Sequence, residues 1–447
     1  MEVNKNGAKE SPEHLDSPAL DLKKITLAYS RFVPPQLVEI LEKQSILDLE
    51  PGTQVEREIT ILFSDVRGFT TISEELTPQK TFELINAYFR RMEPIIFRNN
   101  GFIDKYIGDA IMAIFPKSAS DALHASIDML TELRGFNKDI EEKGFKPLQI
   151  GIGLNTGISM IGTVGGRQKM EGTVISDAVN LASRLESLTK VYGVPLLISE
   201  HTLYSLDDAQ DHCIRFIDRV RVKGKSRPQC IFEIYDADIE KVRTGKTETL
   251  KVFEEAVAYY HYRDIDRAEA LFQSCLHLNP NDFAARLYLS RCDNYRNTGV
   301  HESTGELDKV TFWKDEYNIG IPHIDAQHME LLEQINRLSE TIGSGAGEEE
   351  IANALNFVDK YVNVHFKTEE RLMEEKGYPF LKEHQNQHRI FYQCFLNLKS
   401  EMDDSSQDKV FLLFRTQIFL VDWLINHTTK TDKHLGKFLR EQEASHG

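Results

Sequence analysis

The chain has few cysteines and no cysteine pair. Five cysteines are spread over 447 residues without a Cys-x-x-Cys spacing, which argues against a disulfide framework and against a thiolate zinc site. No run of eighteen or more apolar residues occurs, so we expect no membrane-spanning helix. The polar first 20 residues do not read as a secretory signal. Together these absences predict a cytoplasmic protein whose thiols stay reduced.

Basic residues are few relative to acidic ones. Lys and Arg number 53 against 70 Asp and Glu, a formal net charge of −17, which disfavours nucleic acid or an anionic membrane as a partner. A chain of this length favours about three domains. Histidine is unevenly distributed, because nine of the fifteen histidines lie beyond residue 300. The sequence therefore concentrates imidazole chemistry in its last third.

Histidines and acids interrupt apolar stripes in this last third. His328, for example, lies between Ile324 and Leu331 at steps of four and three, which is the spacing of one helix face. The same reasoning places seven polar groups on core-facing stripes: His328, His365, Glu369, His384, His388, His427 and Asp432. Burying them without partners in a four-helix bundle is unfavourable, and a bound metal pair would remove that penalty.

One pair in this set does not fit a regular helix. His427 and Asp432 are five residues apart, which separates them by about 140° on an ideal α-helix. We therefore expect the helix to loosen between them. His323 and His434 lie near the pattern but off the stripes, so we expect them at the surface or beside the ligands.

Strands and helices alternate in the middle of the chain, from Ile59 to about Tyr235. This mixture predicts an antiparallel or mixed sheet covered by helices. Expected strands are 59–63, 148–154 and 194–198, and expected helices are 78–98, 119–142 and 177–192, with a hairpin over 101–115. An amphipathic helix is expected over 22–46, broken at Pro34–Pro35. Residues 248–297 read as a single helical hairpin of the tetratricopeptide type, acting as a linker.

Two acids and a glycine turn form the first set of chemical groups. Asp65 ends a strand, and the turn at Gly68 lets backbone N–H groups, with Phe69 and Thr70, face a phosphate. Asp109 lies at the hairpin tip. Two carboxylates on neighbouring strands are a natural seat for two divalent ions, and magnesium combines few carboxylates with substrate phosphates.

Cationic and amide groups follow these acids in the chain. Asn180 and Arg184 are one helical turn apart and can reach one ligand together, and Lys223 adds a further basic group. Phosphoryl or nucleotidyl transfer requires such a set, because metals neutralise the attacking and leaving oxygens and cations hold the charge of the transition state.

Four motifs in this order make residues 55–236 resemble the catalytic domain of class III nucleotide cyclases. The motifs are Phe63–Thr70, Ile107–Asp109, Asp177–Arg184 and Val222–Lys225. The resemblance implies a ferredoxin-like, palm-like α/β (α+β) fold that works as a head-to-tail homodimer. It also implies an adenylate cyclase, which converts ATP to 3',5'-cyclic AMP and pyrophosphate.

The same resemblance implies a role for each residue. Asp65, Asp109 and the Val66 carbonyl would hold two Mg²⁺ or Mn²⁺ ions. The other subunit would complete the site with Asn180 for the ribose, Arg184 for the α-phosphate and Lys223 for the terminal phosphates.

Lys105 and Thr173 occupy the two positions that read the base in this family. Both side chains can donate to a purine, and threonine can also accept. The pair resembles adenylyl cyclases in which Thr replaces the usual Asp, a subgroup in which some members respond to bicarbonate. A guanylate cyclase of the same architecture is the alternative, which Lys105 disfavours.

The C-terminal pattern resembles a bacterial hemerythrin domain from Phe312 to Leu439. The matching motifs are Ile324–His328, His365–Glu370, Tyr378–Pro379, the His384/His388 pair and the His427/Asp432 pair. The resemblance implies two irons with a bridging oxygen, and one open position for dioxygen. His384, His388 and His427 would bind one iron and His328 and His365 the other, with Glu369 and Asp432 as bridges. Imidazole and carboxylate ligands suit iron.

The sequence thus predicts a multidomain protein. Its expected parts are an N-terminal tail and helix (1–54), an α/β cyclase domain (55–236), a helical linker (248–297) and an all-α four-helix bundle (308–447). The predicted function is an adenylate cyclase regulated by a di-iron domain that senses oxygen or redox state. The alternative from another class is a non-catalytic oxygen- or iron-binding protein with a cyclase fold as dimerisation module.

Overall fold

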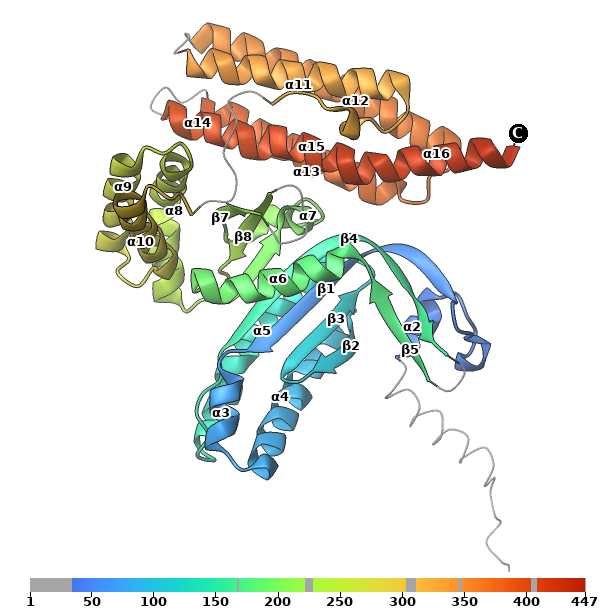
Figure 1. The fold of residues 1–447 in the computed structure, drawn as a ribbon, viewed down its shortest axis with the longest axis vertical. Helices are drawn as coiled ribbons and strands as arrows, with labels where there is room; N and C mark the ends of the chain where they lie inside the picture. Colours follow the sequence, from blue (N-terminus) through green and yellow to red (C-terminus); the bar gives the residue numbers. More distant parts are fainter. Residues whose placement is uncertain are drawn as a thin grey trace, which may run out of the picture. The chain divides into compact units, whose positions relative to one another are not determined.

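A computed structural model describes residues 34–166, 169–221, 228–302, 311–344, 348–402 and 408–446. These residues divide into two compact units. One comprises residues 34–56 and 160–175, and the other comprises the remaining described residues from 57–159 and 176–446. The fold is multidomain, with a mixed-sheet α/β part followed by an all-helical C-terminal part (Figure 1).

A mixed sheet forms the centre of the α/β part, with strand order β2-β3-β1-β4-β6-β8-β7. β4 and β6 pair in parallel, whereas the β1/β3, β2/β3, β6/β8 and β7/β8 pairs are antiparallel. The strand bounds are β1 Gln54–Val66, β2 Phe102–Ile107, β3 Ala110–Phe115, β4 Ile150–Gly165, β6 Leu196–Ser199, β7 Ile214–Val220 and β8 Gln229–Ile234. β1 and β4 are longer than the apolar runs that predicted them.

Three long helices pack on this sheet, close to their expected bounds: α4 Pro78–Arg98, α5 Ala119–Glu141 and α6 Asp177–Tyr192. Each begins at a Ser or Thr whose side chain accepts a hydrogen bond from a backbone N–H of the first turn. On α4, Leu84, Tyr88 and Met92 recur every four residues and are buried in the same core cluster as Ile111 of β3. The helical period therefore decides which α4 face meets the sheet.

The smaller unit contains α2 Pro35–Ile40, a 3₁₀ turn at Ile46–Asp48 and β5 Met170–Ile175, which pairs with the end of β4. The predicted helix over 22–46 is wrong at its end, because α2 stops at Ile40 and Glu42 has a positive φ of 57°. A left-handed residue cannot continue an α-helix. Residues 22–33 of that prediction lie outside the described ranges.

Three helices follow the sheet: α8 Glu240–His261, α9 Ile265–Leu278 and α10 Phe283–Thr298. The expectation of one hairpin over 248–297 is therefore corrected to three helices that start at Glu240. Asp264 and Asp282 cap α9 and α10 through hydrogen bonds from backbone N–H groups, which separates the helices at short acidic turns.

The C-terminal part is a bundle of four rods that lie lengthwise side by side (Figure 1). The first three are α11 Pro322–Gly343, α12 Glu348–Lys376 and α13 Leu381–Met402. The fourth is continuous but changes its winding: α14 Lys409–Thr416, a π-helical stretch Gln417–Asp422, α15 Trp423–His427, a second π-helical stretch Thr428–Asp432 and α16 Lys433–His446. No helix in the described ranges meets the length and hydropathy that a membrane crossing needs.

Candidate functional site

Asp65 and Asp109 are brought together by strand register. β1 and β3 are antiparallel with Ser64 opposite Ile111, so Asp65 at the next position lies beside the hairpin turn that carries Asp109. Gly108 makes this turn with a φ of +65°. Burial and the neighbouring charge and hydrogen bond of Asp109 raise the pKa of Asp65 to about 6.

A divalent cation fits this pair of acids. Two carboxylates this close repel each other when both are ionised, and a cation between them would remove that repulsion. Val66, whose carbonyl follows Asp65, is the last residue of β1. Gly68 then turns the chain with a φ of +68° into α3 Phe69–Glu75, so Phe69 and Thr70 stand in the first turn beside the acids.

Asn180 and Arg184 lie one turn apart on α6, with Asn180 exposed and Arg184 half-buried. Among the described residues, no hydrogen bond or ion pair links either residue to Asp65 or Asp109. Within one chain, therefore, the two acids interact with each other and are not bonded to Asn180 or Arg184.

A third acid, Glu186, lies close to the acid pair and was missed by sequence reasoning. Burial, and next the charge of Asp65, raise the pKa of Glu186 to about 7, while Arg67 opposes the rise. Arg67 itself donates to the carbonyls of Val194 at 2.6 Å and Thr189 at 3.2 Å. No motif marks Glu186, because only the packing of α6 brings it near Asp65.

Of the three remaining predicted residues, the structure describes two. Lys105 lies on β2 opposite Met112, with its Nζ 3.4 Å from Asp104. Thr173 lies on β5 opposite Gly162 and belongs to the smaller unit. Lys223 falls in 222–227, outside the described ranges.

The seven groups of the bundle are buried in its core. Their exposed fractions run from 0 to 3% for His328, His365, Glu369, His384, His388, His427 and Asp432. They come from all four rods, and two sets of donor atoms are close enough to hold an ion: Glu369 with His384, His388 and His427, and Glu369 with His328 and His365.

Glu369 and Asp432 lie between these histidines. His384 Nε2 is 3.4 Å from Glu369 Oε2 and 3.2 Å from Asp432 Oδ1. Asp432 also approaches His427 Nε2 at 3.0 Å and His328 Nε2 at 3.2 Å.

The carboxylate oxygens of Glu369 and Asp432 have no hydrogen-bond partner within the described ranges. Buried anionic oxygens that converge with imidazole nitrogens fit a pair of metal ions.

Three further polar residues orient the imidazoles. Gln327 Oε1 lies 3.2 Å from His365 Nδ1, Glu370 Oε1 lies 2.9 Å from His388 Nδ1, and Gln387 Oε1 lies 3.0 Å from His427 Nδ1. An acceptor at Nδ1 turns the Nε2 lone pair toward the centre. Sequence reasoning missed these residues, although each of the three is the chain neighbour of a predicted ligand.

The expected loosening of the last helix is present. Thr428–Asp432 is π-helical, and i→i+5 hydrogen bonding stacks residues five apart over one another. His427 and Asp432 therefore share one face, which a regular α-helix would not allow. Trp423 stacks on His427 with ring centroids 4.3 Å apart.

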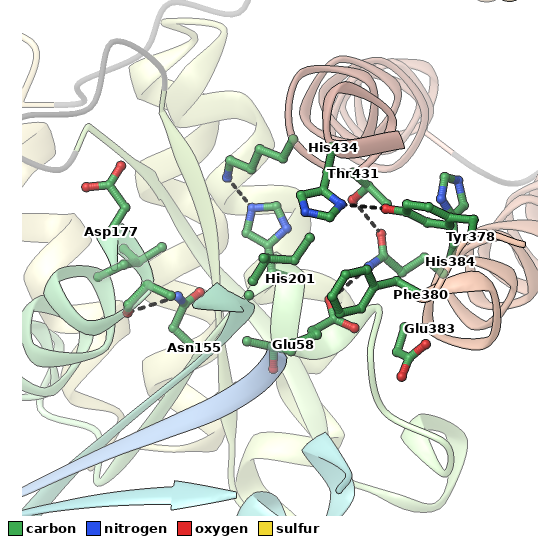
Figure 2. A pocket seen from close by; sticks show the side chains of 17 residues that line it. Glu58, Asn155, Asp177, His201, Tyr378, Phe380, Glu383, His384, Thr431 and His434 are labelled. Carbon is green, nitrogen blue, oxygen red and sulfur yellow. Dashed lines mark hydrogen bonds between the residues drawn. The ribbon is translucent and has the colours of Figure 1, made fainter. Parts of the chain in front are cut away.

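A cavity of about 250 Å³ reaches this centre. Figure 2 shows side chains of the α/β part and of the bundle turned toward it, both within the larger unit. Its wall includes His384 and, from α6, Asp177, Ala178 and Leu181. The cavity thus lies between His384 of the buried cluster and the helix that carries Asn180 and Arg184. Other residues around it are Glu58, Asn155, His201, Tyr378, Phe380, Glu383, Thr431 and His434.

Two family models match the chain. Residues 52–234 match the adenylate and guanylate cyclase catalytic domain, and residues 319–439 match the hemerythrin HHE cation binding domain.

Among curated proteins, the chain is 36% identical over 269 residues to an adenylate cyclase, terminal-differentiation specific, of Dictyostelium discoideum, covering 59% of this chain and 13% of that protein. It is 42% identical over 219 residues to an adenylate cyclase of Anabaena cylindrica, covering 48% of this chain and 44% of that protein. The chain thus spans less than half the length of these relatives. Among solved structures, the adenylyl cyclase CyaB from P. aeruginosa is 34% identical, covers 41% of this chain and 96% of its own, and has a TM-score of 0.38.

Proposed function

Because this chain joins an adenylate and guanylate cyclase catalytic domain to a hemerythrin HHE domain, we propose that it converts ATP to 3',5'-cyclic AMP and pyrophosphate under the control of a di-iron centre. The observation that carries the catalytic half is the Asp65–Asp109 pair, which lies where β1 ends beside the β2/β3 turn. Two Mg²⁺ or Mn²⁺ ions held there would neutralise the attacking and leaving oxygens. The intact pair disfavours the non-catalytic alternative.

The site is completed across a homodimer. Asn180 would orient the ribose and Arg184 would bind the α-phosphate. Among the described residues, neither side chain is bonded to the acids of its own chain. Lys223 would bind the terminal phosphates. A composite site of this kind needs a two-fold dimer in which each interface contributes both halves.

We expect mixed variants to complement each other. An Asp65→Ala chain and an Arg184→Ala chain, each inactive alone, leave one intact site when they pair, since acids and arginine come from different chains. Random pairing of equal amounts makes half the dimers mixed, so roughly a quarter of wild-type cyclic AMP production should return. The control is Asp65→Ala mixed with Asp109→Ala. This mixture should stay inactive, because every site takes both of its acids from one chain and each chain lacks one acid. No recovery in the first mixture would exclude shared sites.

ATP is the proposed substrate on the basis of Lys105 and Thr173. Lysine and threonine can donate to the acceptor nitrogens of adenine. The guanylate cyclase alternative requires GTP to be the better substrate in the same assay. The proposed location is the cytoplasm, because its reducing conditions keep thiols such as the five free cysteines unpaired.

The bundle is proposed to hold two irons. His384, His388 and His427 would bind one iron, and His328 and His365 the other, with Glu369 and Asp432 bridging. When bound, the irons would supply the chemistry for taking up dioxygen or another small ligand. Gln327, Glu370 and Gln387 would keep the imidazoles oriented.

Regulation is proposed to pass through the fourth rod of the bundle. Its first π-helical stretch carries Asp422, which accepts from Arg219 of β7 at 2.7 Å and 2.9 Å. Beside His427, Asn426 donates to Glu200 at 2.7 Å. Within the second stretch, Lys430 donates to Gln229 of β8 at 3.0 Å. The helix that holds His427 and Asp432 is therefore bonded to the paired strands β7 and β8.

The helical linker supplies a second connection. Glu254 of α8 accepts from the Phe216 backbone of β7 at 2.9 Å and pairs with Arg415 of α14 at 3.5 Å. Tyr259 of α8 donates to Asp408, the cap of α14, at 2.6 Å. A shift of the fourth rod would move β7 through the direct contact at Asp422 and through α8. Allostery requires an element with two arrangements that both sites favour differently, and the fourth rod is proposed as that element.

We expect the Arg219–Asp422 pair to transmit the iron state. Wild-type cyclic AMP production should differ between the anaerobic ferrous protein and the same protein in air by about five- to 150-fold, the range of typical couplings. An Arg219→Gln/Asp422→Asn variant should bring this ratio close to one while keeping two irons per chain. Changing both partners avoids leaving one buried charge unpaired.

The matched control neutralises an exposed ion pair of the same bundle, Glu333 and Arg337, whose side chains are 56% and 61% exposed. Glu333→Gln/Arg337→Gln should leave the ratio unchanged. A wild-type ratio in the Arg219/Asp422 variant, with full iron loading, would exclude this pair from the coupling.

A further inference from the structure

A third group of ligand-type side chains lies in the α/β part. The group consists of His124 of α5 and of Asp208 and His212, which precede β7. Each of the three offers one donor atom, and these atoms lie within 4.8 Å of one another. His124 Nε2 is 2.8 Å from Asp208 Oδ2, and His212 Nε2 is 3.4 Å from the same oxygen. These residues belong neither to the cyclase site nor to the di-iron centre.

His212 presents an unsatisfied nitrogen to this group. Its side chain is only 9% exposed, and within the described ranges its Nε2 has no hydrogen-bond partner. The other ring nitrogen, Nδ1, lies 3.1 Å from Asp236 Oδ1. An Nδ1–H that donates to a carboxylate leaves the Nε2 lone pair available, which is the arrangement of metal-binding histidines. Here that lone pair points at Asp208, and either a proton or a metal ion between the two groups would remove their repulsion.

Asp208 and His124 are also held in place. Ser120, in the first turn of α5, donates to Asp208 Oδ1 at 2.6 Å, which leaves Oδ2 facing both imidazoles. His124 follows Ser120 by four residues and therefore lies on the same face of α5. His124 is 46% exposed, so a fourth position of the group opens toward solvent.

The donor set suits zinc. Two imidazoles and one carboxylate are borderline ligands that favour Zn²⁺ over Mg²⁺ or Ca²⁺. Tetrahedral coordination with bonds of about 2.0–2.2 Å separates donors by roughly 3.3–3.6 Å, close to the 3.4 Å between His212 Nε2 and Asp208 Oδ2. The 2.8 Å between His124 and Asp208 requires a small outward turn of the exposed imidazole.

We propose that His124, Asp208 and His212 bind one zinc ion, with water in the fourth position. The ion would join α5 to the chain entering β7 and, through Asp236, to the residues that leave β8. The competing occupant is a proton: a hydrogen bond to Asp236 raises the pKa of His212. The two occupants differ in metal content, which can be measured directly.

The test uses the full chain with both irons reduced under nitrogen and excess Mg²⁺, so that the other metal sites are filled. Titration with Co²⁺ should give one equivalent with the visible absorption of tetrahedral cobalt, displaced by Zn²⁺. His124→Gln and His212→Gln should lose this equivalent and keep two irons. Ser120→Ala, which frees Asp208, should weaken binding by about 10–100-fold.

The control is His277→Gln, at an exposed histidine of α9, which should bind cobalt as the wild type does. The exposed position of His124 lets its variant fold even if His212→Gln does not. Cobalt uptake that is unchanged in His124→Gln, or absent from the wild type with its irons in place, would overturn the proposal.

Discussion

An Asp65→Ala variant is expected to lose cyclic AMP production by about a thousandfold or more. Asp65 and Asp109 lie together where β1 ends beside the β2/β3 turn, and removal of one carboxylate would release a metal that is proposed to stabilise the charge of the transition state. Such stabilisation is worth several kcal/mol, and each 1.36 kcal/mol changes the rate tenfold. The measurement is the initial rate with ATP and, in parallel, with GTP at saturating Mn²⁺.

Glu74→Ala is the matched control for this loss. Glu74 is an exposed acid of α3, near Asp65 in the chain, and its removal should leave the rate within twofold of wild type. Asp109→Ala should reproduce the loss. Wild-type rates in either aspartate variant would refute two-metal catalysis at the Asp65–Asp109 pair.

A His384→Ala variant is expected to fall from two irons per chain toward none. His384 Nε2 lies within 3.0 to 3.4 Å of His427, Asp432 and Glu369, so its loss opens the centre and leaves a buried carboxylate without its partner. Removing one partner of a buried ionic group costs about 3–5 kcal/mol. Iron is measured after reconstitution with ferrous salt, and thermal unfolding of the bundle should shift to lower temperature.

His323→Ala serves as control, because His323 is an exposed histidine near the start of α11. This variant should keep both irons and its unfolding temperature. Two irons in His384→Ala, or none in the reconstituted wild type, would contradict the ligand assignment.

Much of the fold could be predicted because helix and strand periods are local properties. α4 and α6 coincide with the expected 78–98 and 177–192, since a Ser or Thr cap and an apolar period of about 3.6 residues mark each of them. Prediction was poorer where long-range packing extends an element. β1 and β4 run well past their apolar cores, because hydrogen bonds to a neighbouring strand extend a strand into polar sequence.

The seven buried polar groups of the bundle were predictable for the same local reason. Each histidine or acid occupies a position in an apolar helical stripe. Because that stripe is the helix face that packs against the core, the spacing alone predicts that these side chains point inward. Even the π-helical stretch at Thr428–Asp432 followed from a five-residue spacing that no regular helix can place on one face.

Other features depended on the tertiary structure. Glu186 approaches Asp65, Asp422 meets Arg219, and His212 joins His124 across long stretches of chain. No periodic signal marks these contacts, because the two partners of each contact lie on separate elements. From the sequence alone, Glu186, Asp422 and His212 look like ordinary surface residues. The sequence by itself indicated the cyclase and hemerythrin domains that the family models find, because their motifs depend on local residue order and spacing. Only the tertiary structure decided which groups meet between elements, because such contacts depend on how whole helices and strands pack.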